Sequence, residues 1–265
     1  MKGGYPLAAV VWLTITMAVL IGAGCRGRGG AFAGKTAGEM RIVRIGAERV
    51  IFHWIPPGRF RMGSPPEETA RENDETCRNV EVRDGFWLAE TECTQWLWSK
   101  VMGGNPSGFR DDPACPVENV SWNDSRDFLS KIKRYCPDPN WRFELPTEVQ
   151  WEYACRAGSV APFPEPLENS AWHLYNAASR SHPVGKLRPN AWGLADMHGN
   201  IAEWCSDIYS ELPGGGAPSG PGLRVIRGGS WDSAWTCRAA ARNSDSPSLR
   251  IDRVGFRIAL VPVKR

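Results

Sequence analysis

The stretch Leu145-Pro-Thr-Glu-Val-Gln-Trp-Glu-Tyr153 carries the clearest structural signal in the chain. Thr147 and Gln150 form a capping box, in which a hydroxyl and a side-chain amide three residues apart satisfy free N–H groups at a helix start. The predicted helix ends near Arg156, because Gly158 follows and glycine readily adopts the left-handed conformation that closes a helix. This stretch therefore predicts a short helix in the middle of the chain.

Outward from this helix, similar signals predict two more. Ser121 with Asp124 resembles an N-terminal cap, and apolar residues then recur at helical spacing over residues 122–136. Thr94 is placed to cap a short helix over Gln95–Met102, which a glycine pair ends. Strand-like runs of apolar and β-branched residues, bounded by turn residues, occupy residues 50–55, 59–63, 225–227, 238–242 and 254–261.

Regular structure accounts for only part of the chain. About 65 residues after Gly158 show no helical or strand periodicity. Gly 28 and Pro 21 among 265 residues exceed the usual share, which predicts many turns. No internal repeat or interdomain linker is visible, so we expect one loop-rich α+β domain with a few short helices on a small, irregular sheet.

The charge balance restricts the classes of partner. The chain has 32 basic and 29 acidic residues, a formal net charge of +3. This balance gives no reason to expect binding to nucleic acid or to an anionic membrane. Any membrane association is expected only through an N-terminal lipid or signal anchor.

The N-terminus resembles an export signal. Lys2 precedes an apolar run that ends at residue 24, and Cys25 follows small residues as in a bacterial lipoprotein, where it would carry the lipid. A secreted protein cleaved after Ala31-Phe-Ala33 and a retained transmembrane helix are the alternatives. All three place the domain outside the cytosol. We therefore divide the chain into a signal peptide (1–24), a tether (25–47) and one domain (48–262).

The expected export bears on the redox state of the cysteines. Apart from Cys25 there are seven, and none forms a C-x-x-C pair, so a zinc knuckle is not expected. In an oxidising compartment one or more disulfides are plausible, and an odd number leaves at least one thiol unpaired.

A series of motifs in order carries a family resemblance. They are Gly58-Arg-Phe-Arg-Met-Gly-Ser64, Glu92-Cys-Thr-Gln95, Pro116-Val-Glu-Asn-Val-Ser-Trp122, Leu145–Tyr153, Gly193-Leu-Ala-Asp-Met-His-Gly-Asn200, Glu203-Trp204, Arg227-Gly-Gly-Ser-Trp231 and Gly255-Phe-Arg257. Together they resemble the sulfatase-modifying-factor family, which includes the formylglycine-generating enzyme. The resemblance implies a C-type-lectin-like α+β fold, low in regular secondary structure, over residues 48–262.

The resemblance also implies a chemistry, which this chain does not match. The family oxidase converts a sulfatase cysteine to formylglycine, using two cysteines after the Arg-Gly-Gly-Ser motif to hold Cu(I). Here Ser233 stands where the first of these would be, and the second has no counterpart. A hydroxyl is a poor ligand for Cu(I), which prefers soft sulfur. We therefore expect no copper and leave the catalytic residues unassigned.

Two further features follow from the resemblance alone. Family members often pair a cysteine at the position of Cys155 with one at Cys237, which predicts a disulfide here. Such a bond would close a loop of about 80 residues, worth roughly 4–4.5 kcal/mol in the chain-entropy model.

A structural calcium ion is also implied. The family binds it through positions matched here by Asp196, Gly199, Ile201 and Glu203, and such hard oxygen ligands suit calcium. A second family calcium site, which would begin at Asn176 and Ala177, is not expected. The four histidines, His53, His173, His182 and His198, show no metal-binding spacing.

Two functions remain from the sequence. The first is an exported, calcium-stabilised scaffold that binds a protein, peptide or glycan and has lost copper oxidase activity. The second is an active oxidoreductase that converts a sulfatase cysteine to formylglycine at a rearranged site. The two functions differ in what they require of the loop that contains Ser233.

Overall fold

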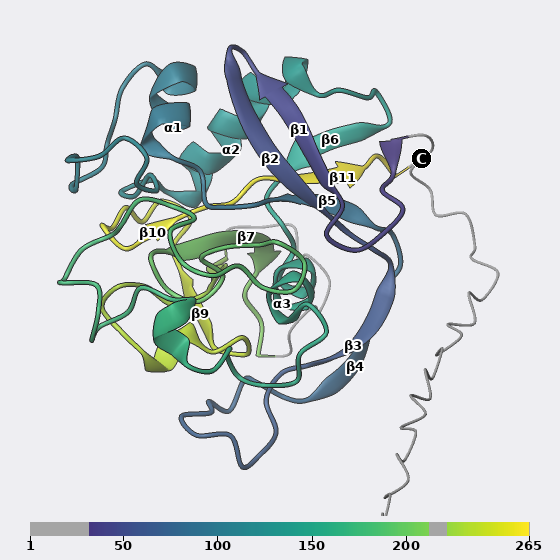
Figure 1. Cartoon of the computed structure of the whole chain (residues 1–265), viewed down its shortest axis with the longest axis vertical. Helices are drawn as coiled ribbons and strands as arrows, with labels where there is room; N and C mark the ends of the chain where they lie inside the picture. Colours follow the sequence, from purple (N-terminus) through teal and green to yellow (C-terminus); the bar gives the residue numbers. More distant parts are fainter. Residues whose placement is uncertain (1–31, 212–221, 265) are drawn as a thin grey trace, which may run out of the picture.

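Strands and long loops dominate the computed structural model, which describes residues 32–211 and 222–264 (Figure 1). The predicted signal segment and Cys25 lie outside these residues. The described part is an α+β fold with three short α-helices and three sheets, which confirms the predicted class.

The largest sheet has five strands in the order β1-β2-β5-β11-β6, all of them antiparallel. The strands are β1 (Met40–Ile45), β2 (Glu48–Ile55), β5 (Phe86–Ala89), β6 (Trp141–Glu144) and β11 (Ala259–Pro262). β11 lies between β5 and β6, so this sheet contains both the first and the last of the described strands.

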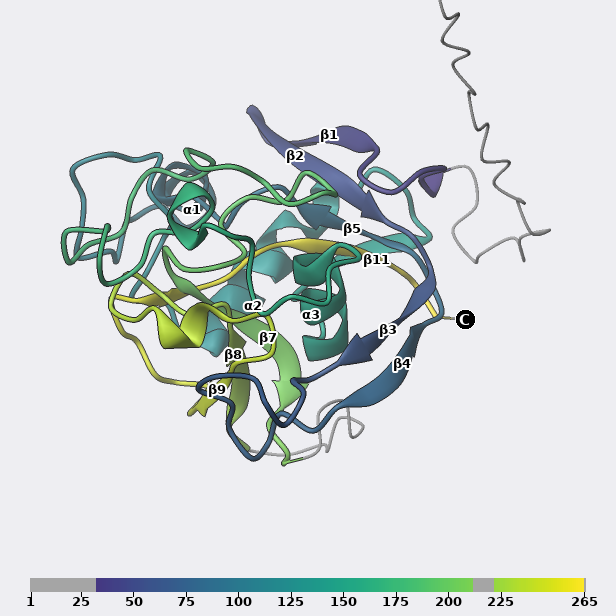
Figure 2. The ribbon, with the colours of Figure 1, turned by 60° about the horizontal axis from the view of Figure 1, so that its bottom comes forward.

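A second sheet has four strands in the order β10-β7-β8-β9. They are β7 (Ala202–Ile208), β8 (Arg224–Arg227), β9 (Arg242–Asp245) and the two-residue β10 (Val254–Gly255). A separate ribbon pairs β3 (Gly58–Met62) with β4 (Arg78–Val82). Figure 2 shows the loop between β3 and β4 reaching toward β9.

The three helices begin at the predicted caps. Thr94 caps α1 (Gln95–Met102), and capping boxes at Ser121 and Thr147 open α2 (Trp122–Ile132) and α3 (Glu148–Arg156). Short 3-10 turns occupy Lys133–Tyr135 (η2), Leu167–Asn169 (η3) and Trp235–Cys237 (η4). α3 packs against the β3–β4 ribbon and against β7, so its motif links two of the sheets.

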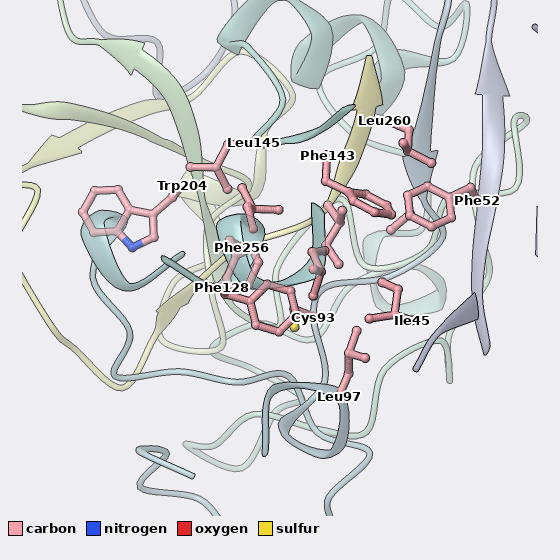
Figure 3. Close-up of a cluster of buried hydrophobic side chains, with 14 of the residues drawn as sticks. Ile45, Phe52, Cys93, Leu97, Phe128, Phe143, Leu145, Trp204, Phe256 and Leu260 are labelled. Carbon is pink, nitrogen blue, oxygen red and sulfur yellow. The ribbon is translucent and has the colours of Figure 1, made fainter. Parts of the chain in front are cut away.

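One large apolar cluster joins the five-stranded sheet to α1, α2 and β7 (Figure 3). Phe52 and Leu260 come from that sheet, Phe128 from α2 and Trp204 from β7. All four side chains are fully buried. A second apolar cluster includes residues of α3, among them Trp151. Many of the tryptophans are therefore core residues.

Several boundaries differ from the prediction. The described part of the expected tether (25–47) belongs to the fold, because β1 pairs with β2 and the buried Phe32 packs edge-on against Trp141. Of the run 238–242, expected to be a strand, residues 238–241 form a buried turn and only Arg242 belongs to a strand, β9; the run 254–261 is broken between β10 and β11. None of the described helices is long and apolar enough to cross a bilayer.

Candidate functional site

A buried network of arginines and glutamates positions the loops around Ser233. Arg227 at the end of β8 forms ion pairs with Glu148 and Glu152 of α3, and its side chain is fully buried. Arg242 binds the same Glu148 through Nε and Nη2 at 2.6 and 3.0 Å. Arg227 also donates to the carbonyl groups of residues 239–241. We call Glu148, Glu152, Arg227 and Arg242 the arginine network; it holds β8, α3 and the segment before β9 together.

Ser233 lies in a tight turn between this network and η4. Its N–H donates to the carbonyl of Ser230 at 3.2 Å, and its Oγ accepts from the N–H of Thr236 at 3.3 Å. The neighbouring Asp232 is held by Arg253 at 3.1 Å. Both bonds hold the turn around Ser233.

Two pockets adjoin the Ser233 turn. The first, of about 260 Å³, contains Ser233 and Asp232 together with Arg253. The second, of about 670 Å³, extends from the exposed Trp235 to the β3–β4 loop. Among the described residues, the linings of both pockets contain no cysteine. Neither pocket therefore offers the pair of thiolates that Cu(I) requires.

Cys237 contacts the Ser233 turn, but it lines neither of these pockets. Its exposed fraction is 0%, and its Sγ donates to the carbonyl of Ser233 at 3.1 Å. Burial raises the pKa of Cys237 to about 12. A buried thiol in this state is a structural residue rather than a nucleophile or a copper ligand.

The predicted disulfide between Cys155 and Cys237 is not formed in the structure, in which all seven described cysteines are free. His198 interacts with both residues instead. Its Nε2 lies 3.4 Å from Cys155 Sγ, and its Nδ1 lies 2.7 Å from the carbonyl oxygen of Cys237. Burial lowers the pKa of His198 to about 4, so the imidazole is neutral. Its Nδ1–H then donates to the carbonyl of Cys237, and its Nε2 accepts a hydrogen bond from the thiol of Cys155.

The residues expected to bind calcium meet in the turn that leads into β7. Asp196 and Asn200 both have positive φ, 56° and 61°, and Gly199 has a φ of 98°. A Cβ at Gly199 would lie 2.2 Å from the carbonyl oxygen of Trp172, so only glycine fits there. The turn therefore brings the side chains of Asp196 and Glu203 toward the same buried region.

Glu203 is already bound by protein groups. Arg257 donates to its Oε1 at 2.7 Å, and Trp151 Nε1 donates to its Oε2 at 2.8 Å. Asp196 differs, because its Oδ2 accepts from the N–H of Gly185 at 2.6 Å while its buried Oδ1 has no hydrogen-bond donor. Of the two predicted carboxylate ligands, Asp196 has the unused oxygen.

The structure adds Glu92, which the sequence reasoning had placed only in a family motif. Its side chain is 2% exposed, its Oε1 accepts from Asn200 Nδ2 at 3.1 Å, and its buried Oε2 has no donor. Burial, followed by the charge of Asp196, raises the pKa of Glu92 well above its usual value. Burial likewise raises the pKa of Asp196, and the charge of Glu203 adds to the effect. We call Glu92, Asp196 and Glu203, with Arg257, the carboxylate cluster.

The carboxylate cluster contains the type of oxygen ligand that a divalent cation prefers. Three carboxyl groups face one guanidinium, and two buried oxygens have no donor. Calcium prefers such carboxylate oxygens together with backbone carbonyls. Within the described residues, no group of three or more His, Cys, Asp or Glu side chains is arranged to hold a metal ion. A calcium ion would therefore depend on Glu92, Asp196 and the carbonyls of Gly199 and Ile201 more than on Glu203.

The position of the second family calcium site contains an internally bonded turn. Asn176 Oδ1 accepts from the N–H of His173 at 2.7 Å, and its Nδ2 donates to the carbonyl of Ala171 at 2.8 Å. His182 stacks on Trp172 with ring centroids 3.9 Å apart, and His53 lies 2.8 Å from Glu90. These histidines and Asn176 therefore have local structural partners.

Comparison with known proteins identifies the family of the chain. The model of the sulfatase-modifying factor enzyme 1-like domain matches residues 47–261. A formylglycine-generating enzyme of Streptomyces coelicolor is 36% identical over 216 residues, which cover 68% of this chain and 65% of that enzyme. The protein named inactive C-alpha-formylglycine-generating enzyme 2 of Mus musculus is 33% identical over 185 residues, covering 62% of this chain and 54% of that protein. The chain thus spans between 54% and 65% of the length of these two relatives.

A solved structure is similar over most of the chain. Treponema denticola variable protein 1 superposes with a TM-score of 0.74 at 28% sequence identity, covering 84% of this chain and 99% of that one.

Proposed function

Because the chain belongs to the sulfatase-modifying factor family, we propose that it is an exported, calcium-stabilised binding or scaffold module without copper oxidase activity. One observation carries this proposal: the pockets beside Ser233 have no thiol in their linings. The serine hydroxyl that replaces the first active cysteine cannot supply a soft ligand for Cu(I).

The remaining thiol near Ser233 supports the same conclusion. Cys237 is fully buried, and its pKa is raised to about 12, so it holds its proton at neutral pH. The family also contains a relative named as inactive, which makes loss of the oxidase reaction a known outcome within it. Both observations favour a binding role for the domain.

Calcium is proposed as a structural ion at the carboxylate cluster. A bound divalent cation would take up the negative charge that Arg257 alone does not balance, and would give the free oxygens of Glu92 and Asp196 a partner. In this role calcium stabilises the turn before β7 and supplies no catalytic step.

The ligand is proposed to be a protein, peptide or glycan that docks on the open pocket beside Trp235. Trp235 is 56% exposed and lines a pocket of about 670 Å³, large enough for several side chains or a sugar unit. An exposed indole provides a flat apolar face for such ligands.

Export is proposed from the sequence before residue 32. An apolar segment followed by Cys25 would place the domain at a membrane surface through a lipid, or release it after cleavage. Nucleic acid is not a proposed partner, because the net charge is only +3.

The test is an oxidase assay with purified protein, Cu(I), oxygen and a peptide that contains Cys-x-Pro-x-Arg. We expect no aldehyde above the level given by the matched peptide with serine in place of cysteine. Formation of an aldehyde that depends on copper and on the peptide cysteine would overturn the proposal, and would establish the oxidoreductase alternative.

A further inference from the structure

The pocket beside Trp235 has walls from three segments that are far apart in sequence. One wall is the β3–β4 loop with Glu72 and Asp74, the second is the end of β7 with Tyr209 and Glu211, and the third is η4 with β9. Its volume is about 670 Å³. We call this pocket the acidic groove. Figure 2 shows the β3–β4 loop and β9 side by side at this face.

The arginines in the acidic groove are fully occupied by protein groups. Arg238 donates to Glu75 at 2.6 Å and to Glu68 at 2.7 Å, and only 3% of its side chain is exposed. Arg242 binds Glu148 at 2.6 Å and Asp74 at 3.3 Å, and 1% of its side chain is exposed. Neither guanidinium is therefore free to bind an anionic ligand.

The carboxylates at the mouth of the groove are in the opposite situation. Glu72 and Glu211 are exposed, and neither has an ion-pair partner within the described part of the chain. Asp74 adds a third carboxylate, which Arg242 neutralises only in part. An open cavity that is lined by uncompensated charge of one sign attracts ligands of the other sign.

Trp235 lies on the rim beside these carboxylates with 56% of its surface exposed. The face of an indole attracts a guanidinium or an ammonium group through its quadrupole. Carboxylates and an aromatic face together bind the planar arginine side chain, since the two groups contact different parts of it.

We infer that the acidic groove binds an arginine- or lysine-bearing segment of a partner peptide, with the cationic side chain between Trp235 and the carboxylates of Glu72 and Glu211. This inference rests on the proposed binding role and names the class of ligand. Charge complementarity and the exposed indole favour it over a neutral peptide or a glycan.

The experiment uses two fluorescein-labelled peptides of glycine and serine that differ at two positions. One carries arginine there, and the other carries citrulline, which keeps the shape and removes the charge. Fluorescence anisotropy with the whole protein measures both affinities at low and at physiological salt. We expect the arginine peptide to bind about tenfold more tightly, with the difference shrinking as salt is added.

Variants assign the preference to the groove. Glu72→Gln combined with Glu211→Gln should remove most of the preference for arginine, and Trp235→Ala should weaken binding of the arginine peptide about fivefold. Asp127→Asn combined with Glu168→Gln makes the same charge change at exposed positions outside the groove, and should leave both affinities unchanged.

Equal affinity for the two peptides, or a full preference in the Glu72→Gln and Glu211→Gln variant, would overturn the inference while leaving a binding role intact. If neither peptide binds, the inference is also wrong. Arrays of glycans and neutral peptides probed with the same protein then decide the broader proposal, which fails if they too show no ligand.

Discussion

The arginine network and the carboxylate cluster are both buried and both charged, yet they are built differently. In the arginine network each carboxylate meets at least one guanidinium: Glu152 accepts from Arg156 and Arg227, and Glu148 accepts from Arg242. In the carboxylate cluster, Arg257 binds Glu203 and leaves oxygens of Glu92 and Asp196 without a donor.

The difference distinguishes a structural network from the proposed calcium site. Buried carboxylates are tolerated when guanidinium groups pair with them, as with Glu148 and Glu152 of the arginine network; Arg227 Nε has no hydrogen bond there but lies 3.6 Å from Glu148 Oε1. A buried carboxylate oxygen without a partner costs free energy unless a proton or a cation supplies one. The free oxygens of the carboxylate cluster therefore need a proton or a cation, whereas the carboxylates of the arginine network are paired by the protein itself.

The largest effect is expected from Arg227→Met, which breaks the arginine network. The substitution leaves Glu148 and Glu152 buried with one fewer cation, and should lower the free energy of unfolding by about 3–5 kcal/mol. Urea unfolding measures this loss of stability. Arg59→Met is the control, because the Arg59 side chain is 80% exposed and its ion pair should be worth less than about 1 kcal/mol. Equal effects of the two substitutions would contradict the distinction.

Calcium should stabilise the wild-type protein through the carboxylate cluster. At a calcium concentration of about 100 times Kd the gain is about 2.7 kcal/mol, a rise in Tm of roughly 5–10 °C, which a chelator reverses. Asp196→Asn should abolish the rise, since the carboxylate with the free Oδ1 is removed, whereas the exposed Asp127→Asn should preserve it. A wild-type Tm that is insensitive to calcium would show that the cluster is filled by protons alone.

Glu75→Gln tests a paired carboxylate by its pH dependence. Burial alone would raise the pKa of Glu75, but hydrogen bonds from Arg238 and Ser64 outweigh burial and lower it. A lowered pKa stabilises the fold above the ordinary glutamate pKa, and this stability is lost as pH falls through the folded value. The variant should therefore be about 2 kcal/mol less stable at pH 7, and the gap should narrow in acid.

The gap is measured by urea unfolding at a series of pH values, with Glu67→Gln as an exposed control from the same loop. A gap that stays constant down to acidic pH would show that the Glu75 carboxylate contributes no pairing energy.

Glu92→Gln should have the smallest effect, and its sign should depend on calcium. Without calcium the change removes a buried carboxyl whose pKa is raised, so stability should stay equal or rise slightly. With calcium it removes a ligand charge, and we expect about tenfold weaker binding, or about 1.4 kcal/mol. Isothermal titration with calcium measures the affinity. An unchanged affinity would remove Glu92 from the ligand set.

Local signals in the sequence predicted the helices well. The caps at Thr94, Ser121 and Thr147 depend on side chains within three residues of the helix start, so they are readable without the fold. The α+β class followed from the same reasoning and from the abundance of turns.

Two expectations differ from the structure for different reasons. β1 pairs with β2 across a two-residue turn at residues 46–47, so this strand is a local feature outside the predicted domain, whereas the burial of Phe32 depends on the distant Trp141. The segment 238–242 resembles a strand, but the bonds from Arg227 to the carbonyls of residues 239–241 hold its first part as a turn. Sequence spacing reveals neither those bonds nor the packing of Phe32.

The same limit applies to the site. The family resemblance implied Asp196 and Glu203, whereas Glu92 lies more than a hundred residues from Asn200, the donor that fixes its Oε1. The contact between His198 and the thiol of Cys155 could not be predicted either, since it requires α3 to pack beside the turn that contains His198.

The anchoring of the β3–β4 loop through Arg238 has an evolutionary consequence. The bonds that fix the loop involve Glu68 and Glu75, which are buried, whereas Glu72, Glu211 and Trp235 at the mouth contribute little to folding. Substitutions at such exposed positions usually change stability by less than about 0.5 kcal/mol. New recognition properties could therefore arise at this face by a few surface changes, while the scaffold that displays them stays the same.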